Sequence, residues 1–189
     1  VELRLVSNIW TDATGFEDVD VELRVGRGDW TDTPSEKLSD EYIVPICGID
    51  LAKTVRKPED LQNGPLIRIL GQEADWGRYF AAHEIAMPTG VSEYFVDTMT
   101  AAIELAATGG GYAVVIKRLV DMANAARPRV GVVGEAVPIP NAHYLMRPRS
   151  KRSKRPEVLL FENWLREEFS KDAVFGSLIS SLDNIQTHR

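Results

Sequence analysis

The order of the apolar segments along this chain is the feature that most restricts its fold. Short runs rich in Val and Ile, the pattern of β-strands, alternate with segments whose apolar residues recur every three or four positions, the pattern of helices. Such alternation favours layers of helices packed on a sheet over a helical bundle or a β-sandwich. We therefore expect an α/β fold.

The expected elements cover most of the 189 residues. Strands are predicted at 1–6, 19–25, 42–47, 66–70, 91–96, 112–116, 129–133 and 142–146. Helices are predicted at 76–84, from 99 to the glycines at 109–111, at 117–126 and from 156 onward, with a weaker helical pattern in the tail 172–189. Asp75 is suited to cap the first of these helices, and Asp97 or Thr98 the second.

Residues 18–30 combine a strand with a glycine turn. Their apolar residues alternate with charged ones, which predicts a strand with one buried face. These apolar residues are Val19, Val21, Leu23 and Val25. Gly26 and Gly28 then end the strand in a loop that the Trp30 indole can cover.

The charge balance argues against a chain that binds nucleic acid by itself. The net charge is −6 and the pI is about 5.2, whereas nucleic-acid-binding domains usually have a basic face and a high pI. One basic cluster, 147–155, carries six positive charges. No aromatic residues lie between these charges to stack on bases, so we interpret the cluster as a solvated loop rather than a DNA or RNA contact.

Membrane and export signals are not expected from this sequence. No segment has the roughly 18 consecutive apolar residues of a membrane span. Residues 1–6 are charged and alternating, unlike a signal peptide or an anchor. Cys47 is the single cysteine, so an internal disulfide is excluded and a reducing compartment fits. We expect a cytoplasmic protein.

The residue patterns of catalysis and metal binding are not found. The pair Gly26 and Gly28 lacks the third glycine of a dinucleotide-binding loop, and no serine sits in a G-x-S-x-G motif. The three histidines are far apart and have no companion at metal-ligand spacing. Cys47 is interpreted as a small packing residue at a strand end rather than a nucleophile, although the same position would border a cleft. We expect no catalytic residues, no metal and no cofactor.

Seven segments, taken in order, resemble the effector-binding domain of LysR-type transcriptional regulators, in particular the branch of the glycine-cleavage and β-lactamase regulators. The first is the run D-x-D-hydrophobic-x-hydrophobic-R-x-G-x-G-D-W at 18–30. The others are at 41–48, 57–61, 75–82, 95–113, 142–146 and 155–165. Each segment alone is weakly specific, but their order over residues 1–169 is a strong signal.

The resemblance implies a two-lobed fold like that of the type II periplasmic binding proteins, with a cleft between the lobes. Lobe I would hold residues 1–48 and 132–171, lobe II residues 49–131, and 172–189 would be a tail. Val1 would correspond to the family's second strand, so the family's first strand and helix would be lacking. The winged helix-turn-helix and linker helix would also be absent from this chain, and we expect a fragment rather than a diverged protein that has lost DNA binding.

The same resemblance implies a sensor of a small, anionic metabolite that forms homodimers or tetramers and meets DNA only through the missing N-terminal domain. Effector contacts would come from Ser7, Asn8, Cys47, Gly48, Val96, Thr98 and Val115. The side chains of Asn8 and Thr98 would offer hydrogen bonds, Gly48 an accessible amide, and Val96 and Val115 apolar walls. Gly48 stands where the family usually has a serine. A purely structural role is left open for each of the seven.

The alternative class is a stand-alone solute-binding protein of the transport type. Such a protein would share the fold but would carry a secretory signal or a lipid anchor. The nature of the region upstream of Val1 would separate the two classes.

Overall fold

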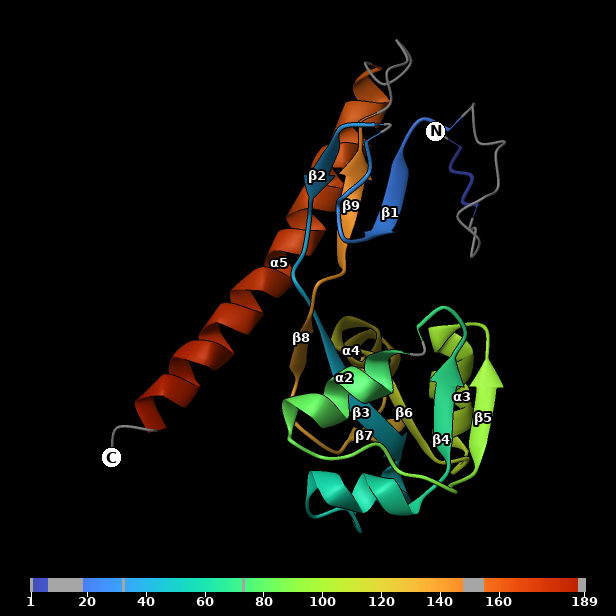
Figure 1. Cartoon of the computed structure of the whole chain (residues 1–189). Coiled ribbons are helices and arrows are strands. Elements are labelled where there is room, and N and C mark those ends of the chain that lie inside the picture. Colours follow the sequence, from blue (N-terminus) through green and yellow to red (C-terminus); the bar gives the residue numbers. More distant parts are fainter. Residues whose placement is uncertain (1, 7–18, 32, 73, 148–154, 187–189) are drawn as a thin grey trace. The chain divides into compact units, whose positions relative to one another are not determined.

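The computed structural model describes residues 2–6, 19–31, 33–72, 74–147 and 155–186. The chain divides into two compact units, which we call unit 1 (Val1–Asp40 and Pro140–Arg189) and unit 2 (Glu41–Ile139). Unit 1 is a small sheet with one long helix, and unit 2 is a larger sheet with helices on both faces (Figure 1). This division counts 41–48 and 132–139 with unit 2, whereas the sequence analysis assigned them to lobe I, because their strands pair with one another there.

Unit 1 contains three antiparallel strands in the order β1 (Glu22–Gly26), β9 (Ala142–Met146) and β2 (Ser35–Lys37). The helix α5 (Pro156–Gln186) runs along this sheet (Figure 1). Its Arg166 guanidinium bonds the Glu36 carboxylate of β2 at 2.9 Å, and its Phe169 ring lies 5.2 Å from the ring of His143 on β9. The helix begins at Pro156 as predicted, since proline fits the first helical position.

Two expectations for unit 1 are wrong. Residues 2–6 are irregular and exposed rather than a strand. In β1 the charged face is covered rather than the apolar face that was predicted to be buried. Leu23 and Val25 are 43% and 48% exposed, while Glu22 and Arg24 are half-buried. The reason is that the loop after β1 folds back over that face, where the Arg24 guanidinium lies 5.6 Å from the centre of the Trp30 ring.

Unit 2 contains a six-stranded mixed sheet. The strand order is β5-β4-β6-β3-β7, and β8 pairs with the other part of β3. Its strands are β3 (Glu41–Gly48), β4 (Leu66–Ile69), β5 (Glu93–Val96), β6 (Tyr112–Ile116), β7 (Val130–Val132) and β8 (Val137–Ile139). Its helices are α1 (Ile49–Ala52), a 3₁₀ helix (Pro58–Asn63), α2 (Ala74–Ala82), α3 (Met99–Ala107) and α4 (Lys117–Asn124).

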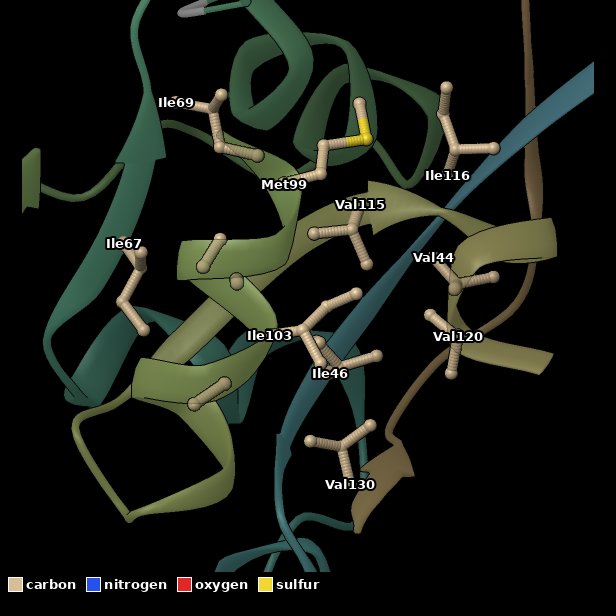
Figure 2. Packing of buried hydrophobic residues seen from close by; sticks show 13 residues of the cluster. Val44, Ile46, Ile67, Ile69, Met99, Ile103, Val115, Ile116, Val120 and Val130 are labelled. Atoms are coloured by element: carbon tan, nitrogen blue, oxygen red, sulfur yellow. The ribbon is translucent and has the colours of Figure 1, made fainter. Parts of the chain in front are cut away.

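Both faces of this sheet are buried at its central strands β3 and β6, which are apolar at nearly every position, whereas the edge strand β5 is largely exposed. One cluster packs Val44, Ile46 and Val115 against α3, whose buried face is Met99, Ala102, Ile103 and Ala106 (Figure 2). The second cluster packs Ile43, Cys47 and Val114 against Trp76, Tyr79 and Phe80 of α2. Each fully buried side chain of this size contributes about 1.5–3 kcal/mol. The central strands therefore hold α3 against one face of the sheet and α2 against the other.

The helix boundaries of unit 2 follow from local signals. Gly109 and Gly111 have φ of +87° and +133°, which glycine adopts readily, and α3 stops just before them as predicted. The predicted cap at Asp75 is wrong, because α2 already begins at Ala74. Asp75 instead lies in the first turn and pairs with Arg78 at 3.0 Å. No helix in the described part of the chain is long and apolar enough to cross a bilayer.

Candidate functional site

The carboxyl ends of three parallel strands meet at one edge of the unit 2 sheet. β4 pairs in parallel with β5, matching Ile69 to Val96, and in parallel with β6, matching Ile67 to Ala113. In α/β sheets, ligands bind outside the carboxyl ends of the strands, where helix N-termini also gather. This edge is therefore the candidate site of the unit.

Helix α3 begins at this edge, directly after β5. Thr98 is its N-cap with an extended backbone (φ −135°, ψ 151°), and its Oγ1 accepts a hydrogen bond from the Ala101 N–H at 3.2 Å. The first intrahelical bond runs from the Ala102 N–H to the Thr98 carbonyl at 3.1 Å. The N–H groups of Met99 and Thr100 therefore have no acceptor within the helix and are available to a ligand.

The electrostatics of this helix end favour a negatively charged ligand. Aligned peptide dipoles place about half a positive charge at a helix N-terminus. α3 has no acidic residue in its first turn, and the nearest carboxylate in sequence is Asp97, directly before the cap. A threonine hydroxyl also carries one donor hydrogen beside its acceptor lone pairs. Thr98 can thus cap the helix and donate to a ligand at the same time.

The packing of α3 fixes the position of this N-terminus. Ala102 and Ala106 are fully buried, and such small side chains let the helix lie close to β3 and β6. Met99, in the first turn, is 9% exposed and belongs to the same cluster. The N-terminal end of α3 is therefore held by the packed core of unit 2.

Gln72 adds a polar group after β4 that no pattern in the sequence indicated. It follows β4 in a turn where Gly71 has φ +80°, and its N–H donates to the Ile69 carbonyl at 2.9 Å. The Leu70 N–H donates to the Val96 carbonyl at 2.9 Å, so this turn lies beside the end of β5. Gln72 Oε1 is buried without a hydrogen-bond partner among the described residues. Buried polar atoms are usually paired, so this oxygen can accept a hydrogen bond from a ligand that reaches it.

A buried ion pair lies at the same edge of the sheet. β3 runs antiparallel to β6, so its first residues lie beside the carboxyl end of β6. There Arg118 Nε approaches Glu41 Oε1 at 3.4 Å, and the Glu41 side chain is only 3% exposed. A buried carboxylate needs such a partner, because desolvation alone would strongly disfavour its charge.

The structure brings together only part of the predicted effector set. Val96 ends β5 and Thr98 caps the next helix, so these two lie at the same edge. Val115 is fully buried in the α3 cluster and Cys47 in the α2 cluster, on opposite faces of the sheet. Ser7 and Asn8 lie outside the described residues.

Gly48 lies at the other end of α3 from Thr98. A Cβ atom at Gly48 would be 3.1 Å from the carbonyl oxygen of Ala106, near the C-terminus of that helix. The reason is strand direction: β3 enters unit 2 at Glu41 and ends at Gly48, on the edge opposite the carboxyl ends of β4, β5 and β6. The sequence shows that Gly48 ends a strand, but not which edge that end reaches.

The thiol of Cys47 has the character of a packing residue. Burial raises its pKa to about 11, so the reactive thiolate is scarce at neutral pH. Its side chain is fully buried, as the packing interpretation predicted. In the described ranges, no group of three or more His, Cys, Asp or Glu side chains gathers as a metal site.

Comparison with known proteins identifies the family. The model of the family described as LysR substrate binding domain matches residues 1–170. Because this match spans most of the 189 residues, the chain belongs to the family of LysR substrate-binding domains. The resemblance noted in the sequence is thereby confirmed.

Curated relatives are longer proteins. The HTH-type transcriptional regulator PerR of Escherichia coli is 30% identical over 176 residues, which are 90% of this chain and 57% of PerR. The uncharacterized HTH-type transcriptional regulator y4mQ of Sinorhizobium fredii is 32% identical over 135 residues, 69% of this chain and 44% of that protein. The chain thus spans about half the length of these relatives.

Solved structures confirm the fold class. The effector domain of AmpR of Pseudomonas aeruginosa matches with a TM-score of 0.77 and 23% identity, over 94% of this chain and 84% of that one. The AmpR effector binding domain from Citrobacter freundii matches with a TM-score of 0.71 and 23% identity, over 82% and 77%. The chain therefore has the type II periplasmic-binding-protein-like α/β fold of these domains.

Proposed function

We propose that this chain is the ligand-sensing module of a LysR-type transcriptional regulator and that its effector is a small anionic metabolite. The single observation that carries the anionic character is the open N-terminus of α3 at the carboxyl edge of the sheet. Helix N-termini bind anions because free N–H groups and the helix dipole both point at the ligand. Family membership supports regulation over the transport alternative.

The contacts in unit 2 follow from the geometry of this edge. The Met99 and Thr100 amides and the Thr98 hydroxyl would donate to the anion. Val96 would supply an apolar wall, and Gln72 Oε1, an acceptor, would take a hydroxyl or amine of the effector. This set leaves out Cys47 and Val115, whose side chains are fully buried. It also leaves out Gly48, which lies at the other end of α3.

The remaining features of the whole regulator are proposals from the family. Ser7 and Asn8 would add contacts from lobe I across the expected cleft. Homodimers or tetramers would form in the cytoplasm, and DNA would be bound through a segment outside this chain. Effector binding would change transcription only as far as the metabolite prefers one of two existing arrangements of the regulator.

The first experiment is a screen of small metabolites by thermal unfolding of the full chain. A molecule that binds only the native state raises the melting temperature. We expect hits among small carboxylates and phosphates. A screen in which only cationic or uncharged molecules raise the melting temperature would contradict the anionic effector.

The second experiment places the hit at α3 by calorimetric titration. Thr98→Val should weaken binding by about tenfold, because it removes a hydrogen bond to a charged group. Thr98→Ser should bind as the parent does. The matched control is Thr108→Val, which makes the same change at the exposed C-terminal end of the same helix. Equal affinities for Thr98→Val and Thr108→Val would remove Thr98 from the site.

A further inference from the structure

Unit 2 contains a cavity that the proposed function does not use. Its volume is about 440 Å³, within the range of small-molecule sites, and it lies between the loop after α1, the end of α2 and the segment after β7. None of the described residues predicted to contact the effector lines this cavity. The cavity is therefore independent of the candidate site at α3.

Two cations line one side of this cavity. Arg56 and Lys57 are exposed, and neither forms a salt bridge with any described residue. Their backbone is held in place, because both N–H groups donate to the Asp60 carboxylate, at 2.8 and 3.2 Å. These bonds fix the loop that carries the two cations and lower the pKa of the Asp60 carboxyl, which both cationic side chains lie near enough to lower further.

One carboxylate lines the cavity beside them. Glu135 follows β7 and is exposed, and among the described residues it too has no salt-bridge partner. Some other charges of unit 2 are paired, for example Lys53 with Asp50 at 2.6 Å and Arg129 with Glu104 at 2.6 Å. The cavity thus combines two cations and one anion that do not neutralise each other directly.

Polar atoms without partners lie along the wall formed by α2. The fully buried Tyr79 hydroxyl and the buried His83 Nε2 have no hydrogen-bond partner among the described residues. The two rings are 4.7 Å apart, one helical turn from each other. His83 lines the cavity, and the Tyr79 hydroxyl lies directly behind Gly134, where a Cβ atom would collide with it. Buried polar atoms are usually paired, so His83 Nε2 is available to a polar occupant of the cavity.

We propose that this cavity binds a small zwitterion, namely an α-amino acid with a short apolar side chain. Its carboxylate meets Arg56 and Lys57, and its ammonium group meets Glu135. A carboxylate without the amine would leave Glu135 without a partner, and an amine without the carboxylate would be repelled by the two cations. Val55, Pro58 and Val132 at the same cavity give the short side chain an apolar surface.

The test uses the full ¹⁵N-labelled chain and three matched probes: L-alanine, propionate and ethylamine. Propionate lacks the ammonium of alanine, and ethylamine lacks its carboxylate. We expect alanine to shift the amide resonances of Arg56 and Gly134 in a saturable manner. Each half-molecule should bind about tenfold or more weakly, since each loses one charge-assisted contact.

Variants then test which charged side chains of the cavity contact alanine. Arg56→Gln and Glu135→Gln should each weaken alanine binding by about tenfold or more. Arg127→Gln and Glu59→Gln, which remove the same charges from exposed positions that do not line the cavity, should leave it unchanged. Thr98→Val should also bind alanine normally, which separates this site from the proposed effector site.

Three results would overturn the proposal: no saturable shift at the cavity with alanine, equal affinity for alanine and propionate, or no effect of Arg56→Gln and Glu135→Gln. Retained alanine binding in Thr98→Val together with loss in Arg56→Gln would support it. If the metabolite screen found no anion that binds at α3, the alanine results would still test this cavity.

Discussion

The indole of Trp30 meets the phenol ring of Tyr144 edge to face, with ring centroids 5.3 Å apart and an interplanar angle of 82°. Tyr144 lies on β9, so this contact ties the loop after β1 to the central strand of the unit 1 sheet. A Cβ atom at Gly26 would be 2.7 Å from Cζ2 of the indole. Gly26 therefore allows Trp30 to cover this end of β1, as the sequence predicted.

Trp30→Ala should lower the free energy of unfolding by about 2 kcal/mol. Fully buried tryptophans lose about 3–5 kcal/mol on truncation, and Trp30 is only half-buried. Urea unfolding, followed by far-UV circular dichroism, measures the change. Trp30→Phe, which keeps a ring over Gly26, should lose less. Equal stability of Trp30→Ala and the parent would show that the indole does not hold this loop.

Glu36 should make the stability of unit 1 depend on pH in the acid range. Hydrogen bonds from Arg166 and then Arg147 lower the pKa of Glu36 from 4.5 to about 2. Because the folded pKa is lowered, this stabilisation is present above pH 4.5 and is lost as the pH falls toward 2. Solvent screens these partly exposed groups, so we expect about 1–2 kcal/mol.

The measurement compares the parent with Glu36→Gln by urea unfolding at several pH values. The variant should be less stable at pH 6, and the difference should shrink as the pH falls below 4.5. Glu167→Gln removes an exposed carboxylate from α5 and is the matched control. A difference between parent and Glu36→Gln that stays constant from pH 6 to 3 would contradict the role of this ion pair.

Thr98→Val should destabilise unit 2 by about 1 kcal/mol through loss of the N-cap. The Thr98 hydroxyl accepts from the Ala101 N–H, and valine cannot replace that bond. Thr98→Ser keeps the oxygen and should retain the parent stability. Chemical denaturation of the two variants side by side tests this. If valine and serine proved equally stable, the cap would carry no free energy.

Cys47 should be unreactive in the folded protein. Its thiol is fully buried and has its pKa raised to about 11 by that burial, so both access and thiolate formation are suppressed. Iodoacetamide at pH 8 should modify the native chain far more slowly than the chain unfolded in urea. Equal rates in the two states would place the thiol at an accessible surface, where the effector contact first expected for Cys47 becomes feasible.

Long apolar elements were predictable because their pattern is local. The strands 112–116 and 142–146 match β6 and β9, and the α3 face of Met99, Ala102, Ile103 and Ala106 is buried as predicted. The apolar residues of each such element recur with the period of a strand or a helix. The element can therefore be predicted without knowing what it packs against.

Short elements and strand faces were not predictable in the same way. β2 and β8 have three residues each and exist through pairing with β9 and β3, which no local period shows. Which side of β1 is exposed depends on where the loop that carries Trp30 folds. That loop is held by the contact of Trp30 with Tyr144, which lies more than a hundred residues away in the sequence. Likewise, Gly48 and Thr98 were grouped by resemblance, but strand direction places them at opposite ends of α3.

The central claim is that an anionic metabolite binds at the N-terminus of α3. The most direct measurement is amide chemical-shift mapping of the labelled chain with the metabolite that most raises the melting temperature. The account predicts that the backbone amides of Met99 and Thr100 shift most strongly within unit 2, and that Thr98→Val weakens the effect. A bound metabolite that leaves both amides unmoved would contradict it.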